Sequence, residues 1–243
     1  MKTINVLVAT LLCVAPTIAA NATTAARVST SAGASFAGRV DMAEAEHGGV
    51  PVDVLRLALG AIRCATASGD IEAPPTLTLI DYSRPSVEPR MWVFDLRSGR
   101  LLFKELVAHG RNTGENMATR FSDAMESHQT SLGLFVTSDT YVGSNGYSLR
   151  LDGMEPGFNA RARERAIVMH GAPYVDAKLA AAQGRIGRSW GCPALREAVA
   201  RDVIDTIRGG GVIFSYYPDA AWLKSSRFLN GCGGGASTVL ATS

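Results

Sequence analysis

The stretch GRSWGCPAL, residues 187–195, places a cysteine, Cys192, on a glycine-flanked turn directly before a predicted helix. That helix is expected over residues 193–208, because Pro193 suits the first helical position and apolar residues recur at every fourth position. Three glycines at 209–211 then end it. Since the free N–H groups of a helix N-terminus favour a thiolate, the stretch predicts a reactive cysteine.

His170 is the predicted partner of this cysteine. It ends the apolar run 166–169, twenty-two residues before Cys192. A histidine at a strand end can take the proton of a thiol, and amide N–H groups from Trp190 to Cys192 can bind an oxyanion, which suits acyl transfer. Taken alone, Cys192 has a simpler interpretation as a small buried apolar side chain, and His170 has one as a core histidine.

The composition favours an exported protein with one main domain. Residues 1–20, with Lys2 followed by an apolar stretch and small residues, are typical of a signal peptide, the alternative being an uncleaved anchor or a buried N-terminal helix. Residues 21–49, rich in Ala, Ser, Thr and Gly, are expected to be a flexible leader. The net charge of +2 does not indicate a nucleic-acid surface. The arginines at 161, 163 and 165 could contact an acidic substrate, but their interpretation as a solvated rim is favoured.

Three cysteines remain after the predicted cleavage: Cys64, Cys192 and Cys232. An odd count in an oxidising compartment leaves one thiol unpaired, so a Cys64–Cys232 disulfide would leave Cys192 free. The alternative is that Cys64 is simply buried and Cys232 lies in a mobile tail over residues 231–243. No pair of cysteines or histidines has metal-ligand spacing, so no metal site is expected, and acyl transfer by a cysteine and a histidine needs no organic cofactor.

The pattern of apolar residues predicts a β-rich α+β fold, a mixed sheet or sandwich. Residues 50–70 have helical periodicity and form an expected N-terminal packing helix, and the helix after Cys192 is the second. The main domain is expected over residues 76–230. Its strands are predicted at 76–80, 91–96, 101–108, 132–137, 147–151, 166–170 and 212–217.

These motifs resemble the catalytic domain of L,D-transpeptidases (YkuD-type), and in particular the murein L,D-transpeptidase subfamily. Their signature is His-Gly, a spacer, and Ser/Thr-His-Gly-Cys. Here it corresponds to His170-Gly171, seventeen residues, and the SWGC of residues 189–192. The TSLGLF stretch at 130–135 is similar to a strand that lines the same cleft. VAHG at 107–110 and FS at 121–122 also fit the subfamily, and the resemblance covers residues 76–217.

The resemblance implies roles for individual residues. Cys192 would be the nucleophile and His170 the general base, with the Ser189 carbonyl orienting the imidazole. Amides near Trp190 and Gly191 would bind the oxyanion. Trp190 stands where the family has a histidine. Its indole is expected to form a wall of the cleft or to lie in the core rather than to donate a hydrogen bond through its N–H.

The substrate-binding side chains are less clear from the resemblance. Ala194 stands where many members have a basic or amide residue, so Arg188 and Arg196 are candidates to contact a substrate carboxylate. His109 either borders the cleft as a substrate hydrogen-bonding group or is structural.

The implied activity is peptidoglycan cross-linking through a Cys192 thioester on stem tetrapeptides, in the periplasm or outside the cell. The partners would be stem peptides, with no nucleic acid and no stable membrane span after signal cleavage, and the protein would be a monomer. One alternative is an L,D-carboxypeptidase that hydrolyses the same thioester. The other is a catalytically idle wall-binding module, which a buried or disulfide-bonded Cys192 would favour.

Overall fold

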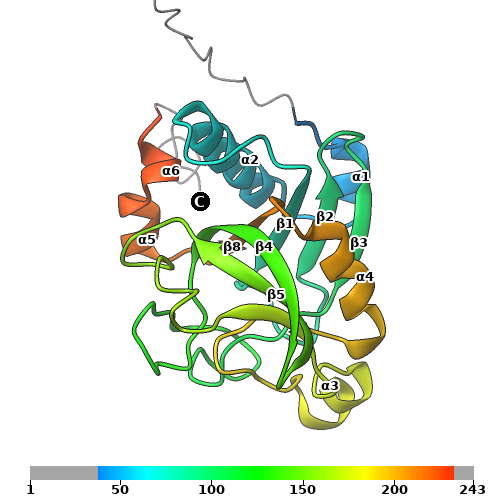
Figure 1. The fold of residues 1–243 in the computed structure, drawn as a ribbon. Helices are drawn as coiled ribbons and strands as arrows, with labels where there is room; N and C mark the ends of the chain where they lie inside the picture. The colour runs from blue at the N-terminus through cyan, green and yellow to red at the C-terminus, as the bar shows by residue number, and fades with distance from the viewer. Residues whose placement is uncertain (1–37, 233–243) are drawn as a thin grey trace, which may run out of the picture. The chain divides into compact units, whose positions relative to one another are not determined.

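An eight-stranded mixed sheet runs through the computed structural model, which describes residues 38–232 (Figure 1). The strand order is β3-β2-β1-β8-β4-β5-β6-β7, with β1–β8 and β6–β7 parallel and the other pairs antiparallel. The predicted β-rich α+β class is confirmed. The strands are β1 (Thr76–Asp81), β2 (Met91–Asp95), β3 (Leu101–Glu105), β4 (Gly133–Gly143), β5 (Gly146–Gly153), β6 (Val168–Gly171), β7 (Ala194–Leu195) and β8 (Val212–Tyr216).

The central strands are buried on both faces, and their alternating side chains fill two separate cores. Leu134 of β4 and Phe214 of β8 belong to one core, whereas their neighbours Phe135 and Ile213 belong to the other. Successive side chains of a strand point to opposite faces, so one apolar run supplies both cores. We call the first face the helix face and the second, which contains Cys192, the cysteine face.

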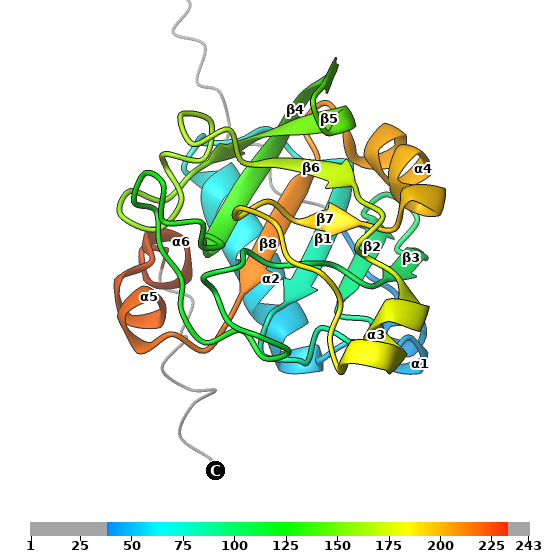
Figure 2. The same cartoon turned by 90° about the horizontal axis from the view of Figure 1, so that it is seen from below.

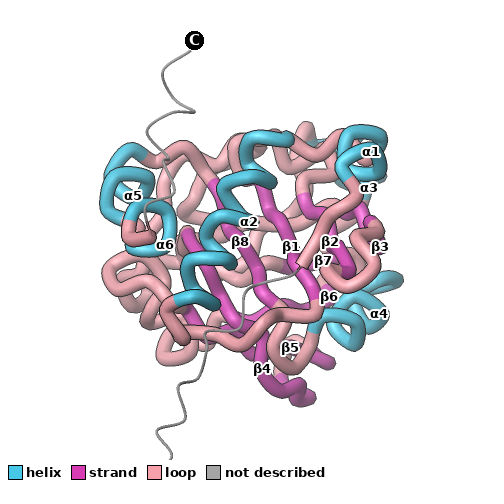
Figure 3. The backbone as a smooth tube through the Cα atoms, turned by 90° about the horizontal axis from the view of Figure 1, so that it is seen from above, coloured by secondary structure: helices cyan, strands magenta, loops and turns pink. Residues whose placement is uncertain are grey.

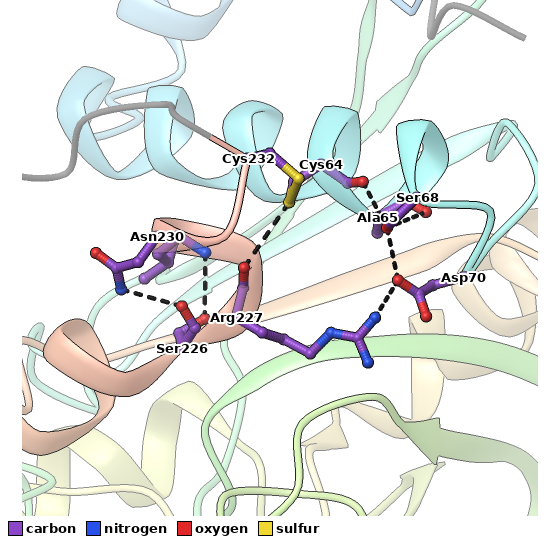
Figure 4. The surroundings of a disulfide bond; sticks show 9 residues. Cys64, Ala65, Ser68, Asp70, Ser226, Arg227, Asn230 and Cys232 are labelled. Atoms are coloured by element: carbon purple, nitrogen blue, oxygen red, sulfur yellow. Dashed lines mark hydrogen bonds and ion pairs between the residues drawn. A yellow bond between two sulfur atoms is a disulfide. The ribbon is translucent and has the colours of Figure 1, made fainter. Parts of the chain in front are cut away.

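The helix face is covered by α2 (Val52–Ala67), which lies across β8 and β1 (Figure 3). Its buried side chains recur at helical spacing, which agrees with the helix expected at 50–70. Two short C-terminal helices, α5 (Ala220–Ser225) and α6 (Arg227–Asn230), pack on the same face. A disulfide joins Cys64 of α2 to Cys232, with Cα atoms 5.5 Å apart, and the predicted pairing is confirmed (Figure 4).

The predicted leader is ordered at its end, and to that extent the prediction is wrong. Residues Met42–His47 form α1, because the Asp41 carboxylate accepts hydrogen bonds from the N–H groups of Ala43 and Glu44. The indole N–H of Trp92 donates to the Gly48 carbonyl at 3.0 Å, which fixes the segment to β2. The predicted signal peptide and residues 233–243 of the predicted tail lie outside the described residues. Within residues 38–232, no helix has the length and apolarity to cross a bilayer.

The segment after Cys192 begins as a strand, and the helix predicted from residue 193 starts later. Ala194 pairs with His170 in β6 and bridges Ala108 on its other side, so two residues of β7 precede α4 (Glu197–Ile207) (Figure 2). Residues 106–110, which follow β3, thereby reach β7 at the other edge of the sheet, although β3 itself ends at Glu105. The spacer between β6 and β7 contains α3 (Ala177–Gln183).

Candidate active site

Cys192 lies on a tight turn between Gly191 and β7, and it is the free cysteine of the described residues. Its thiol donates to the Ala166 carbonyl at 3.7 Å, and the Val168 N–H donates to its sulfur at 3.5 Å. The side chain is therefore held against β6 and is only 8% exposed. Residues 38–232 contain no group of three or more His, Cys, Asp or Glu side chains placed to hold a metal ion.

His170 lies on the same strand that holds the thiol, two residues beyond Val168. Its Nδ1 is 2.9 Å from the Gly171 carbonyl, which can only accept, so Nδ1 carries the proton and Nε2 of the neutral ring is unprotonated. No hydrogen bond within the described residues links His170 to Cys192. The carbonyl beside the imidazole is that of Gly171 rather than the predicted Ser189, whose carbonyl accepts from the Arg111 N–H at 2.8 Å.

Ser189 instead shapes the turn that carries the thiol. Its hydroxyl donates to the Cys192 carbonyl at 2.6 Å and accepts from the Gly191 N–H at 3.1 Å. Thr130, from the TSLGLF stretch, donates to the Gly191 carbonyl at 3.5 Å and accepts from the Gly110 N–H at 3.0 Å. The stretch that the resemblance placed at the cleft therefore contacts this turn directly.

The predicted nucleophile and its predicted base are both uncharged at neutral pH. Burial raises the pKa of the Cys192 thiol above its usual 9.0, and the Val168 N–H and the positive charge of Arg165 only partly oppose this. Burial also lowers the pKa of His170 below its usual 6.5, against the effect of its hydrogen bond to Gly171. The expected help from a helix N-terminus is absent here, because α4 begins only at Glu197. At rest, Cys192 is therefore a thiol, and His170, two residues along the strand from Val168, is a neutral imidazole that is able to accept a proton.

Arg165 was interpreted from the sequence as part of a solvated rim, and that interpretation is wrong, since its side chain is 3% exposed. Its guanidinium donates to the carbonyls of Ser122 and Gln129 at 2.8 and 2.7 Å and to the hydroxyls of Ser127 and Ser131 at 3.1 and 2.5 Å. It thereby fixes residues 122–131, which we call the clamp loop, beside the Cys192 turn. The feature of the sequence that could have indicated this burial is the position of Arg165 directly before the apolar run 166–169.

Trp190 projects from the same turn with 67% of its surface exposed, so it is not a core residue. Its indole stacks on the ring of His128 in the clamp loop, with centroids 4.9 Å apart and planes inclined by 24°. The guanidinium carbon of Arg111 lies 6.0 Å from the ring centroid of Trp190. Of the expected roles, an aromatic wall next to the thiol agrees best with this position.

The remaining candidate side chains are engaged in the structure. His109 is 1% exposed, and its Nδ1 lies 2.7 Å from Nη2 of Arg90, so it does not border an open cleft. Burial, with the nearby charge of Arg90, lowers the pKa of His109 to about 3. Arg188 donates to the carbonyls of Arg111 and Gly114 and to the Glu115 carboxylate.

Arg196 is engaged in the same way. It forms a two-pronged ion pair with Glu105 at 2.9 and 2.7 Å. Both arginines proposed as substitutes for the missing basic residue therefore already have partners within the fold.

The comparison with protein families decides the assignment of the domain. A model of the L,D-transpeptidase catalytic domain matches residues 46–216, which include the Cys192 turn, β6 and the clamp loop. The chain belongs to the L,D-transpeptidase family. No curated protein matches the sequence.

Solved structures similar to this L,D-transpeptidase-family chain are distant in sequence. An L,D-transpeptidase from Mycobacterium smegmatis is 15% identical with a TM-score of 0.38, and the match covers 59% of each chain. L,D-transpeptidase 3 from Mycobacterium tuberculosis is 13% identical with a TM-score of 0.38, covering 59% of this chain and 62% of that one. The helical cell shape determining protein Pgp2 from Campylobacter jejuni is 11% identical with a TM-score of 0.39, covering 65% and 57%.

Proposed function

We propose that the protein is a peptidoglycan L,D-transpeptidase that forms cross-links through a thioester on Cys192. The observation that carries the proposal is the position of the free thiol, which two hydrogen bonds hold against the strand that bears His170. This arrangement occurs inside a domain of the L,D-transpeptidase family. The hydrogen bond from Val168, two residues before His170, supports a pairing of the uncharged thiol with the neutral imidazole.

In the proposed reaction, Sγ of Cys192 attacks the carbonyl carbon of the third, L-centred residue of a stem tetrapeptide. His170 takes the thiol proton at Nε2 and returns it to the amine of the departing D-alanine as the peptide C–N bond breaks. An amine of a neighbouring stem then attacks the thioester, loses its proton to His170 and releases the thiol. No charge has to be stored on the enzyme between turnovers.

Negative charge on the attacked carbonyl oxygen needs donors at the Cys192 turn. The Gly191 N–H is engaged with Ser189, whereas no backbone hydrogen bond of the described residues uses the Trp190 N–H. No backbone hydrogen bond of the described residues uses the Cys192 N–H either, so we assign the Trp190 and Cys192 amides to the oxyanion and leave out the Gly191 amide. The indole of Trp190, being exposed, forms a wall beside the same carbonyl.

The site of action follows from the substrate. L,D-transpeptidases act on cell-wall peptidoglycan, so we expect this protein in the periplasm or outside the cell, as the predicted signal peptide also indicates. Its partners are then stem peptides, and it works as a monomer.

The test is incubation of the purified protein with disaccharide-tetrapeptides, followed by mass analysis of the products. Cross-linked dimers and free D-alanine are expected, with a covalent adduct on Cys192 in the intact protein. Cys192→Ala is expected to lower turnover by at least ~10³-fold. Tripeptide without dimer would identify the L,D-carboxypeptidase instead, and product formation by Cys192→Ala would contradict the proposed nucleophile.

A catalytically idle wall-binding module is the second candidate, and the burial of Cys192 favours it. The two candidates differ in the behaviour of the thiol with substrate present. An enzyme loses its titratable thiol as the thioester accumulates. An idle module binds the same muropeptide with the thiol unchanged.

A further inference from the structure

A groove opens beside Trp190, on the loop that follows β3. It has a volume of about 500 Å³ and is formed mainly by residues 111–120, together with Arg188. Single exposed apolar side chains are common on protein surfaces, so Trp190 alone would indicate little. A groove of this size whose Arg111 contacts the exposed indole is a stronger indication of a ligand site.

The groove is positively charged, because it contains three arginines and a single glutamate. Arg188 is neutralised by Glu115, which also pairs with Arg185 at 2.9 Å. Arg111 and Arg120 differ, since within residues 38–232 neither guanidinium has a hydrogen bond or an ion pair. Two exposed cations without counter-charges therefore remain free to bind an anion.

The groove is directly connected to the Cys192 turn. The Arg111 N–H donates to the Ser189 carbonyl at 2.8 Å, and Gly110 pairs with Ser189. A Cβ placed on Gly110 would lie 3.0 Å from the Gly191 Cα, so the two segments are in contact. The guanidinium of Arg111 in turn lies over the Trp190 ring. Arg111 therefore joins the groove to the Cys192 turn, through its contacts with Ser189 and Trp190.

We infer that this groove is a carboxylate-binding subsite for the acidic stem peptide, with Arg111 and Arg120 as the binding cations and Trp190 as an adjoining apolar wall. Guanidinium groups bind carboxylates in a two-pronged geometry, and the free charges match a peptide that carries several carboxylates. The inference rests on the proposed function for the identity of the peptide. It also accounts for the loss of the basic residue at Ala194, since Arg188 and Arg196 are occupied.

The experiment measures binding separately from turnover, using Cys192→Ala to prevent acylation. The probe is a disaccharide-tetrapeptide, titrated by calorimetry, together with the same compound after its carboxylates are converted to amides. Arg111→Gln and Arg120→Gln are expected to weaken binding by about tenfold each, and added salt should weaken wild-type binding most. Arg97→Gln is the matched control, because that exposed arginine lies in the turn at the opposite end of β3 and should leave affinity unchanged.

The outcomes separate this subsite from the proposed reaction. Arginine-dependent binding without any product would support the subsite and contradict the transpeptidase. Cross-linking with unchanged affinity in Arg111→Gln and Arg120→Gln would overturn the subsite alone. Equal affinity for the amidated probe, or for the disaccharide without a peptide, would also overturn it, the latter in favour of a glycan site. Melting temperatures close to wild type are expected for both arginine variants, because within residues 38–232 neither guanidinium has a hydrogen bond or an ion pair and the contact of Arg111 with Trp190 is exposed.

Trp190 is tested with two variants that differ only in whether an aromatic ring remains. Trp190→Phe is expected to retain affinity within about twofold, whereas Trp190→Ala should lose about fivefold because the apolar wall is removed. Equal losses in both variants would contradict the wall, since they would place the effect in the indole N–H.

Discussion

Replacement of Gly191 by alanine should destabilise the protein more than the same change at another glycine with a positive φ. Gly191 has φ +120°, and an added Cβ would lie 2.7 Å from the Gln129 carbonyl oxygen and 2.9 Å from a methyl carbon of Ile167. The backbone strain costs about 1–3 kcal/mol. Crowding in a packed site adds about 1–3 kcal/mol, since the Gln129 oxygen belongs to the clamp loop that Arg165 holds in place.

Gly210→Ala is the matched control, with φ +100° and nothing within 4 Å of the added Cβ. It should show the strain without the crowding. The difference between the two variants is then about 1–3 kcal/mol in the free energy of unfolding, or a urea midpoint roughly 1 M lower for Gly191→Ala. Urea unfolding followed by tryptophan fluorescence measures both. Midpoints that agree within error would refute the close approach of the clamp loop to the Cys192 turn.

Three further predictions concern the thiol, the disulfide and a buried histidine. The rate at which iodoacetamide alkylates Cys192 should stay low at neutral pH, with the midpoint of its rise above the usual thiol pKa of 9.0. His170→Ala should leave this midpoint unchanged and lower turnover by ~10²–10⁴-fold. A midpoint near neutrality would contradict the assignment of an uncharged thiol and imidazole. Replacing Cys64 and Cys232 by serine opens a loop of 168 residues and should cost about 5 kcal/mol in urea unfolding, without altering Cys192 alkylation in the folded fraction. Folded His109 stays neutral down to about pH 3 whereas the unfolded side chain takes a proton below 6.5, so stability should fall as the pH falls through this window. His109→Asn, whose side chain does not titrate, should show a smaller fall in the free energy of unfolding between neutral and acidic pH. The same fall in wild type and His109→Asn, measured by urea titration, would contradict the role of His109.

The sequence predicted the parts of the site that depend on spacing and local pattern. The apolar run ending at His170 and the glycine-flanked Cys192 lie side by side in the structure, joined through Val168. The disulfide was one of two alternatives, and counting cysteines was enough to raise it. These inferences succeed because a strand and a turn can each be recognised from a few consecutive residues, and an unpaired thiol follows from the number of cysteines.

Features that depend on distant partners were missed. Pro193 is typical of a helix start, but pairing of Ala194 with His170 and Ala108 extends the sheet there first, and a two-residue strand has no periodicity to detect. The burial of Arg165 depends on four acceptors in the clamp loop, more than thirty residues away along the chain. Asp41 is a standard N-cap residue, yet the small-residue composition around it favoured a leader.

The disulfide and the buried thiol lie on opposite faces of the sheet, and this separates their oxidation chemistry. Thiol–disulfide exchange proceeds through a thiolate, which Cys192 supplies only sparingly while its pKa is raised and its sulfur is covered. An oxidant strong enough to link Cys64 to Cys232 therefore meets little competition from the third cysteine once β6 and the Cys192 turn have come together. The burial that keeps the Cys192 thiol protonated therefore also keeps it out of wrong disulfide pairs.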